Sequence, residues 1–471
     1  MADPTWISVL PPLLAIVLAI VSRQVYMSLA AGVWLGWTIV NGWDPASGLA
    51  TALDRTVGVL GEPDSARVIL FTLVIGALIA TVEASGGVRG FVEWVERKDW
   101  VTSPRRAQAL AWLIGLVIFI ESNITVLVAG AIGRPLFDRF RSSREKLAYI
   151  IDSTSAPICI LIPLNAWGAY VLGLLGGVEV ERPLEVFVAS IPVNFYAIAA
   201  VLLAAATWVF NIDLGAMRGA ERRTREEGRL LSPGAKPMVD PDVISPEPDA
   251  RIPPRALNMI LPIAAMVFMM PVALFITGGG DLREGSGTTS VLWAVLTGLA
   301  VAWTLLLAQR AYTVDRLTQT GLKGAGGLMG MALVLLLALA LADVAQALGT
   351  GPYIAGVTAD VLPPVLFLPL VFLVAGLVAF STGTSWGTFG IMIPLAVPAA
   401  ETLGLPAAPF VAASLSGGIF GDHSSPISDT TIIASMAAAT DHIDHVRTQL
   451  PYAALAGGVA VVGFALLGST L

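Results

Sequence analysis

The chain has 471 residues, of which 56% are hydrophobic and only 13% are charged. Because soluble domains carry about 25% charged residues, this composition excludes an ordinary soluble protein and indicates an integral membrane protein. The net charge of −7 says little about partners and indicates no nucleic-acid surface, because in membrane proteins the placement of Lys and Arg is informative. A single cysteine, Cys159, excludes an intrachain disulfide.

Apolar runs of about 20 residues, the length that crosses a bilayer, recur along the whole chain. No basic segment precedes the first run, so we expect a retained span rather than a cleaved signal peptide. Polar residues interrupt two of the predicted spans, 147–172 and 406–439. The ten predicted spans are 6–22, 25–41, 67–86, 147–172, 187–210, 256–277, 290–309, 324–348, 406–439 and 449–469.

Two further apolar stretches, 107–137 and 363–400, carry the polar patches FIESNIT and FSTGTSWGT at their middle. Basic residues flank both ends of the first stretch, which predicts that both ends are cytoplasmic, and its 31 residues are too few for two crossings. We therefore predict a re-entrant hairpin with its tip buried in protein. The second stretch has no Lys or Arg at either end, and we place both ends outside. With this topology, 23 of the 27 basic residues are cytoplasmic.

The topology divides the chain into two repeats of opposite orientation, 1–211 and 256–471, joined by a cytoplasmic linker at 212–255. The predicted fold is an all-α polytopic membrane protein with two inverted-topology repeats, each of five transmembrane helices plus one re-entrant hairpin, with one broken helix per repeat. DSTSAPI, starting at Asp152, matches DHSSPI, starting at Asp422. Interrupted helices at corresponding places in inverted halves indicate a transporter's binding site. We expect both termini outside and a linker with little fixed structure.

The matched motifs contain the oxygen atoms that a hard cation prefers. Pro157 and Pro426 lack an N–H, so we expect them to disrupt their helices and free backbone carbonyls beside hydroxyl groups. A carboxylate inside a membrane is usually paired, protonated or functional, although hydrogen bonding across the broken helix is an alternative here. The residues predicted to bind Na+ or a proton are Asp422, Asp429, Glu121, Ser424, Ser425, Ser428 and Thr430, with Na+ held by Asp422 and Asp429.

From Gly324 to Val446 the chain contains no Lys or Arg but seven acidic residues. No fixed cation is available in this stretch, so we predict that a mobile cation or a proton neutralises the buried acids. Asp343 lies alone in an apolar run, and the sequence leaves gating and a structural role equally open.

Other polar residues are predicted to support the site. Glu121 at the first tip either binds the ion or pins the turn, and packing of small residues is the alternative role for the second tip. His423 is predicted to sense pH or to donate a hydrogen bond. His442 and His445 are predicted to lie in a solvated turn rather than a metal site. The supporting residues are Ser122, Asn123, Thr125, Asp152, Ser153, Thr154, Ser155, Thr382, Thr384, Ser385, Thr388 and His423.

GDHSSPISDTTIIAS followed by DHIDHVRTQLPYA closely resembles the signature of NhaC-type Na+/H+ antiporters of the ion-transporter superfamily. SREKLAYIIDSTSAP, NAWGAY and GTSWGTFGIMIPLAVP are also similar to that family, so the resemblance covers nearly the whole chain. It implies a homodimeric secondary transporter of the cytoplasmic membrane, whose hairpin tips and broken helices enclose the site and move as an elevator. Many relatives carry two acids at the first tip, where this chain has Glu121 and Ser122.

The leading hypothesis is Na+/H+ exchange across the cytoplasmic membrane, with both ions competing for one carboxylate site. The alternative is a Na+- or H+-coupled carrier of a small organic solute, an amino acid or a carboxylate, which the single-acid tip favours. We expect no enzymatic activity and no cofactor; the Tyr-Asp and Gly-x-Gly-Asp motifs of an intramembrane aspartyl protease are missing. A purely structural protein would not explain two matched helix breaks. The expected partners are Na+, H+, the lipid bilayer and a second copy of the chain.

Overall fold

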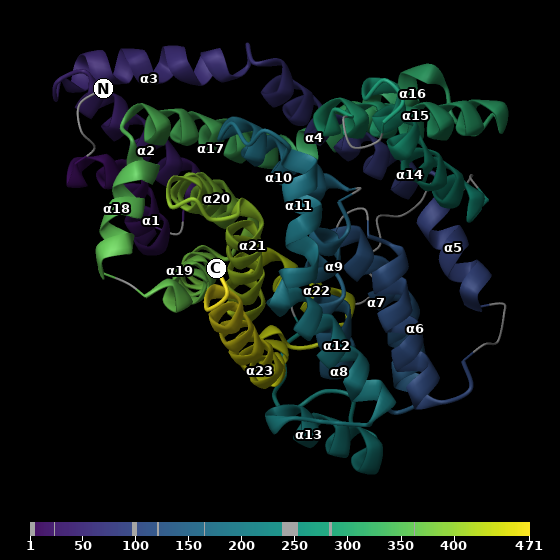
Figure 1. Ribbon diagram of the computed structural model, residues 1–471. Coiled ribbons are helices and arrows are strands. Elements are labelled where there is room, and N and C mark those ends of the chain that lie inside the picture. Colours follow the sequence, from purple (N-terminus) through teal and green to yellow (C-terminus); the bar gives the residue numbers. More distant parts are fainter. Residues whose placement is uncertain are drawn as a thin grey trace.

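The computed structural model describes residues 5–22, 24–96, 101–119, 122–163, 165–237, 253–281, 285–361 and 363–471. These residues form helices and connecting loops, and none of them lies in a β-strand. Figure 1 shows α3 and α13 at opposite ends of the molecule, with the other helices packed between and beside them.

The helices of the first half are η1 (Trp6–Val9), α1 (Leu10–Ser22), α2 (Val25–Val40), α3 (Pro45–Val59), α4 (Pro63–Ala84), α5 (Gly87–Glu96), α6 (Pro104–Val117), α7 (Ser122–Arg139), α8 (Arg144–Ser153), α9 (Ala156–Leu161), α10 (Ala166–Gly177), α11 (Pro183–Ser190), η2 (Ile191–Val193) and α12 (Phe195–Val209). The linker contributes α13 (Gly215–Arg222) and a π-helical turn, η3 (Arg223–Glu227). The second half has α14 (Leu257–Thr277), α15 (Gly287–Ala308), α16 (Val314–Gly327), α17 (Met329–Ala347), α18 (Thr350–Val361), η4 (Pro364–Leu366), α19 (Phe367–Thr382), α20 (Ser385–Thr402), α21 (Ala407–Ser424), α22 (Asp429–Ala437) and α23 (His442–Gly468).

The described part of the chain has five segments long and apolar enough to cross a membrane: α4, α14, α15, η4 with α19, and α23. Three bent helix pairs raise this number to as many as eight if each pair is one span, and α1 and α2 are shorter apolar helices. Each of the ten predicted spans coincides with one or more of these helices or with the α21–α22 pair. The protein is therefore an all-helical, multi-pass membrane protein.

Helix breaks are more frequent than the sequence predicted. The predicted interruption of 147–172 is present, and the segment breaks twice, between α8 and α9 and again before α10, where it bends by 42°. The predicted span 406–439 breaks between α21 and α22. However, 187–210 was predicted to be continuous and bends by 47°, and near the start of the predicted span 324–348 helix α17 meets α16 at a bend of 46°. Hydropathy alone misses these bends because the residues at the break are themselves mostly apolar.

Both predicted hairpins consist of two helices joined by a short connection. In the first, α6 ends at Val117 and α7 begins at Ser122; in the second, α19 ends at Thr382 and α20 begins at Ser385. Gly383 turns the second tip with a φ of +67°, and a Cβ atom on it would lie 2.4 Å from the carbonyl oxygen of Ile427. Because Ile427 lies between α21 and α22, a glycine at this position lets the hairpin tip contact the broken helix.

The two halves of the chain pack directly against each other near these breaks. In Figure 1, α22 of the second half lies among helices of the first half, and it packs against both α7 and α8. A Cβ atom on Gly130 of α7 would lie 2.6 Å from the Cβ of Ala437, so the two helices approach closely. The first broken helix and the second are therefore neighbours.

Helix α3 was not predicted, because its charged residues and short length hide it from a hydropathy search. Asp44 caps its first turn by accepting a hydrogen bond from the N–H of Ala46, and Pro45 occupies the first helical position, where its missing N–H has no effect. Leu49, Leu53 and Val57 project from its exposed side. Helix α3 is thus amphipathic and lies at one end of the molecule (Figure 1).

The expectation that the linker has little fixed structure is wrong for its residues 212–237. This segment forms α13 and η3 and is joined to α8 and α23 by hydrogen bonds and ion pairs. Lys146 of α8, fully buried, donates to Asp213 at 2.9 Å, and Glu221 accepts hydrogen bonds from the N–H and hydroxyl of Ser143. The composition of the linker, rich in charge and proline, predicted a loop without fixed structure, but several of its charged side chains have buried partners.

Candidate ion-binding site

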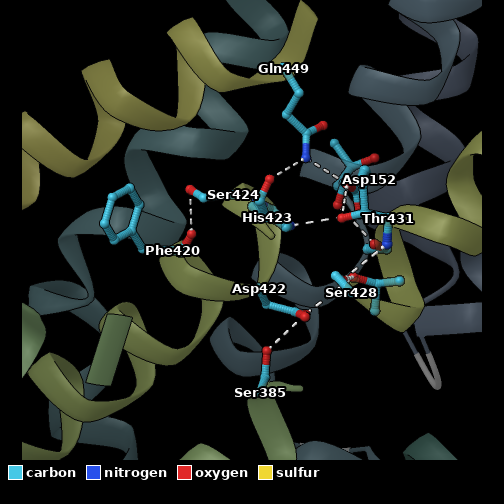
Figure 2. Close-up of polar contacts among 12 residues, drawn as sticks. Asp152, Ser385, Phe420, Asp422, His423, Ser424, Ser428, Thr431 and Gln449 are labelled. Atoms are coloured by element: carbon cyan, nitrogen blue, oxygen red, sulfur yellow. Dashed lines mark hydrogen bonds and ion pairs between the residues drawn. The ribbon is translucent and has the colours of Figure 1, made fainter. Parts of the chain in front are cut away.

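Asp422 joins three structural elements at the end of α21. Its side chain is fully buried, and its Oδ2 accepts hydrogen bonds from the hydroxyl of Ser385 at 2.9 Å and from that of Thr430 at 3.2 Å (Figure 2). Ser385 is the first residue of α20, directly after the second hairpin tip, and Thr430 lies in the first turn of α22. The predicted proximity of the second tip to the broken helix is therefore present at Ser385.

Hydroxyl groups hold the break between α21 and α22 in place. Ser428 caps α22 by accepting a hydrogen bond from the N–H of Thr431, and its hydroxyl lies 3.1 Å from that of Thr430. Ser425 donates to the carbonyl of Phe380 on α19, and Ser424 donates to Phe420 one turn earlier on its own helix. Each hydroxyl oxygen retains lone pairs, so this break is lined by atoms that can bind a hard cation.

Asp152 forms a second buried acidic group, at the end of α8. Its Oδ2 accepts hydrogen bonds from the amide of Gln449 at 2.7 Å and from the hydroxyl of Thr431 at 3.2 Å. The Nε2 atom of His445 lies 3.4 Å from the same oxygen, and the Nε2 of His423 lies 3.8 Å from Oδ1. Figure 2 shows His423, Thr431 and Gln449 converging on Asp152.

The two acids accept hydrogen bonds from consecutive residues of α22. Thr430 donates to Asp422, and Thr431 donates to Asp152. Asp152 belongs to the first half of the chain and Asp422 to the second, so the matched motifs of the two halves come together at the first turn of α22 (Figure 2). The matching of these motifs in the sequence was informative, but their contact was not predicted.

The predicted solvated turn for His442 and His445 is wrong. Both side chains are buried, because Asp441 caps α23 and the helix carries them inward. His442 contacts the hydroxyl of Ser435 and the carbonyl oxygen of Pro426, whereas His445 faces Asp152. A signal was present in the sequence, because His445 and Gln449 are four residues apart and so share one helix face.

Thr431 and Gln449 also take part in the site region and were not among the predicted residues, and Asn165, a weaker candidate from the sequence, lies there too. Asn165 caps α10, and its amide donates to the carbonyl of Phe119, beside the first hairpin tip, at 2.9 Å. Tyr170 of the same helix donates to the carbonyl of Trp386, beside the second tip, also at 2.9 Å. The start of α10 therefore contacts both hairpins.

The supporting hydroxyl residues mostly donate to nearby backbone. Thr154 donates to Ile150, Ser155 to Asp152, Thr382 to Val378, Thr388 to Thr384, and Thr125 to Ile118. Ser122 and Ser153 are buried. Glu121 and the side chains of Asn123 and Asp429 lie outside the described residues, so their predicted roles stay predictions. The backbone of Asp429 begins α22.

The stretch 324–446 was predicted to offer its buried acids no fixed cation, but Asp343, a partly exposed acid of that stretch, has one from elsewhere in the chain. Arg55 of α3 lies 3.9 Å from its carboxylate, and the two side chains are 57% and 34% exposed. The cation comes from the other half of the chain, which an inspection of residues 324–446 alone could not reveal. Asp343 is therefore paired at the surface, whereas the ionisable side chains within ion-pair distance of Asp152 in the described part of the chain are the two histidines.

No cluster of three or more His, Cys, Asp or Glu residues suited to a metal ion is found among the residues that the structure describes. The oxygen atoms around Asp422 are of a different kind, because carboxylates and hydroxyls suit hard cations such as Na+.

Comparisons with known proteins agree with a transporter. An uncharacterised protein of Haemophilus influenzae is 34% identical over 98% of this chain and 91% of its own length. The arginine/ornithine antiporter ArcD of Halobacterium salinarum is 30% identical over 47% of this chain and 43% of its own. Among solved structures, the YdaH transporter of Alcanivorax borkumensis is similar in fold, with a TM-score of 0.59 at 14% identity, covering 90% of this chain and 89% of that one.

The sequence profile of the Na+/H+ antiporter family matches residues 176–469, more than half of the chain. The matched region includes α20 to α23 and thus Ser385, Asp422, Thr430 and His445. The resemblance noted from the motifs is thereby confirmed, and with it the expectation of a transporter rather than an enzyme. The chain belongs to the Na+/H+ antiporter family.

Proposed function

We propose that the protein exchanges Na+ for H+ across the cytoplasmic membrane and that Asp422 is the centre of its cation site. The observation that carries the proposal is the position of this buried carboxylate between the hydroxyls of Ser385 and Thr430, at a break between two helices. Placing an unpaired, charged carboxylate at the centre of a membrane costs about 3 kcal/mol even on the lowest scales. A cation or a proton at this position removes that cost.

The proposed Na+ ligands are oxygen atoms of α21, α22 and the break between them. Asp422 supplies a carboxylate, and Asp429, at the start of α22, is proposed to supply another. The hydroxyls of Ser424, Ser425, Ser428 and Thr430 surround the break. Six or more oxygen ligands are typical of hard cations, and this set offers enough without water.

Exchange follows if Na+ and H+ compete for these acids. The site then carries less charge with either ion bound than when empty, so only the occupied forms cross the low-dielectric region readily. We propose that hairpin 363–400 and the α21–α22 pair move together as an elevator, because Ser385, Gly383 and Ser425 join them. The inverted repeats, the outside termini and the homodimer stay predictions.

The test is an assay of internal pH in proteoliposomes after addition of external Na+. We expect Na+-driven proton flux in the wild type and none above the level of empty liposomes in Asp422→Asn and Asp429→Asn. Asp441→Asn is the matched control, because Asp441 caps α23 and accepts a hydrogen bond from the N–H of Lys236, and asparagine also caps helices. If folded wild-type protein shows no Na+-dependent proton flux, the proposal is overturned.

A coupled carrier of an organic solute is the second candidate, and one observation favours it. Trp386 follows Ser385 directly, and its ring packs against Trp167 with centroids 4.3 Å apart and against Tyr170. Aromatic faces attract organic cations, and one relative of this chain is named an arginine/ornithine antiporter. A thermal-shift screen of amino acids and carboxylates, with and without Na+, distinguishes the candidates: a Na+-dependent shift by one solute favours the carrier.

A further inference from the structure

The buried group around Asp152 has no role in the exchange described above. Asp152 and His445 are both fully buried, and they come from helices of different halves, α8 and α23. The Nε2 atom of His445 lies 3.4 Å from Asp152 Oδ2. Among the described residues, no hydrogen-bond partner is found for either ring nitrogen of His445. The same is true of the Oδ1 atom of Asp152. A buried imidazole and a buried carboxylate thus face each other, and each can form further hydrogen bonds.

This arrangement suits a proton better than any other ion. A buried charge needs a partner, and the group has no Lys or Arg within ion-pair distance in the described part of the chain. One added proton converts Asp152 and His445 into either an ion pair or two neutral, hydrogen-bonded groups. Na+ would gain less here than at Asp422, because the carboxylate is surrounded by two imidazoles, the N–H2 end of Gln449 and one hydroxyl, that of Thr431, rather than by several oxygen atoms.

The group is placed to respond to a cation at Asp422. Thr430 and Thr431, consecutive residues, contact Asp422 and Asp152 respectively. Positive charges repel strongly over such short distances in a buried environment, where the effective dielectric constant is about 20 or less. Na+ at Asp422 therefore disfavours a proton at Asp152 and His445, and the proton leaves as the cation binds.

A cavity about the size of one water molecule lies beside the group. It has a volume of about 10 Å³ and is lined by Tyr149, Tyr196, His423, Gln449 and Tyr452 among others. Tyr452 reaches the linker, where its hydroxyl accepts a hydrogen bond from the N–H of Leu214. The cavity therefore lies between His423 and Gln449, which contact Asp152 or its neighbours, and Tyr452, which contacts the linker.

The titratable groups around Asp152 are few. Lys146 and Glu145, nearer the start of α8, are paired with Asp213 and Arg223, and Asp138 of α7 is paired with Arg144. The groups that face Asp152 and His445 from the helices packed around them are Tyr149 of α8, Tyr196 of α12, Asp422 and His423 of α21, and Tyr452 of α23. The side chain of Asp429 lies outside the described residues.

We propose that Asp152 and His445 together hold a second transported proton, separate from the proton that competes with Na+ at Asp422, so that two protons cross for each Na+. The inference rests on the proposed Na+/H+ exchange and adds its stoichiometry. Exchange of two protons for one Na+ moves net charge, so a membrane potential drives it.

The experiment measures the pH gradient at which net flux stops in proteoliposomes, with the membrane potential held at zero by valinomycin and equal K+. At that point the free energy of one Na+ gradient equals that of the protons exchanged, and every tenfold gradient is worth about 1.4 kcal/mol. For a tenfold Na+ gradient, flux therefore stops at about half a pH unit if two protons are exchanged and at about one unit if one is.

We expect about half a unit for the wild type and about one unit for Asp152→Asn and His445→Gln, which keep a hydrogen-bonding side chain but lose the titrating pair. Thr448→Val is the matched control, because Thr448 is buried on α23 between His445 and Gln449 and its hydroxyl donates only to its own helix. It should keep the wild-type value.

The outcomes separate the two proposals. Wild-type flux that stops at about one unit overturns the second proton and leaves the exchange standing. Variants that keep the wild-type stopping point, or that lose all flux including Na+ for Na+ exchange, overturn the assignment to Asp152 and His445. A wild type without Na+-driven flux overturns the proposed function itself.

Discussion

The amide of Gln449 donates a 2.7 Å hydrogen bond to the carboxylate of Asp152, joining residues that are 297 positions apart in the chain. The same amide donates to the carbonyl of His423 at 2.9 Å, so one side chain connects α8, α21 and α23. All three residues are buried. The two halves of the protein are therefore linked at the acidic group itself and not only by apolar packing.

Gln449→Leu should destabilise the protein. The substitution removes a donor from a buried carboxylate, and leaving a buried polar group unsatisfied costs about 1–3 kcal/mol, more for a charged group. Thermal unfolding in detergent measures the loss. Gln449→Glu should be worse than leucine, because it places a second carboxylate against Asp152. Equal stability of the leucine variant and the wild type would show that the hydrogen bond contributes nothing net.

Gly383→Ala should distort the second hairpin tip. Its φ of +67° is unfavourable for alanine, and the added Cβ would lie 2.4 Å from the carbonyl oxygen of Ile427. Backbone strain of this kind costs about 1–3 kcal/mol, and the clash adds to it. Gly404→Ala is the control, since Gly404 has a φ of +71° but no atom within 4 Å of its added Cβ. The difference between the two variants in thermal stability and in Na+-driven flux isolates the contact with Ile427.

Arg223→Ala should weaken the packing of the linker on α8. Arg223 is 14% exposed and pairs at 2.8 Å with Glu145, which is 1% exposed. Removing one partner of a buried ion pair costs about 3–5 kcal/mol, because the other charge stays buried. Arg229→Ala is the matched control: it pairs with Glu227, the two side chains are 66% and 55% exposed, and exposed pairs contribute about 0–1 kcal/mol. The two variants are compared by unfolding in urea, with proteolysis of the linker as the readout. Equal effects of the two substitutions would contradict the predicted role of the Arg223–Glu145 pair.

Acidification should loosen the contact between the linker and α23. Burial alone would raise the pKa of Asp441, but hydrogen bonds from the backbone N–H groups of Lys236, Asp444 and Ile443 outweigh it, and the pKa lies below its ordinary value of 3.8. A carboxyl group whose folded pKa is lowered stabilises the fold above its unfolded pKa, and this contribution is lost as pH falls through the folded value.

The measurement is hydrogen exchange of the amides at 232–237 between neutral pH and pH values below 3.8, corrected for intrinsic rates. Protection should fall in the wild type at low pH. In Asp441→Asn it should be lower at neutral pH and change less on acidification. A wild-type profile without pH dependence would count against the role of Asp441.

The sequence predicted those features that depend on local chemistry. Hydroxyl groups and proline inside apolar runs located the breaks at Asp152 and Asp422, and the polar patches located both hairpin tips. These signals are local because a missing N–H or a glycine with positive φ acts on its own turn of helix.

Long-range contacts could not be predicted in the same way. His445 was misplaced and Gln449 was not predicted, because only packing decides whether a polar helix face meets water or an acid of another helix. Arg55 and Arg223 have partners far along the chain, in α17 and α8. Their charges suggested solvated surface, since a single sequence does not show which opposite charges the fold brings together.

The contact of α22 with both acids makes the two halves of the chain dependent on each other. Asp152 is contributed by one half of the chain, whereas Thr431, His445 and Gln449, which surround it, are contributed by the other. Either half alone would lack part of this acidic group, so the group is complete only when both halves have folded against each other. A substitution in one half therefore acts on the stability of the other.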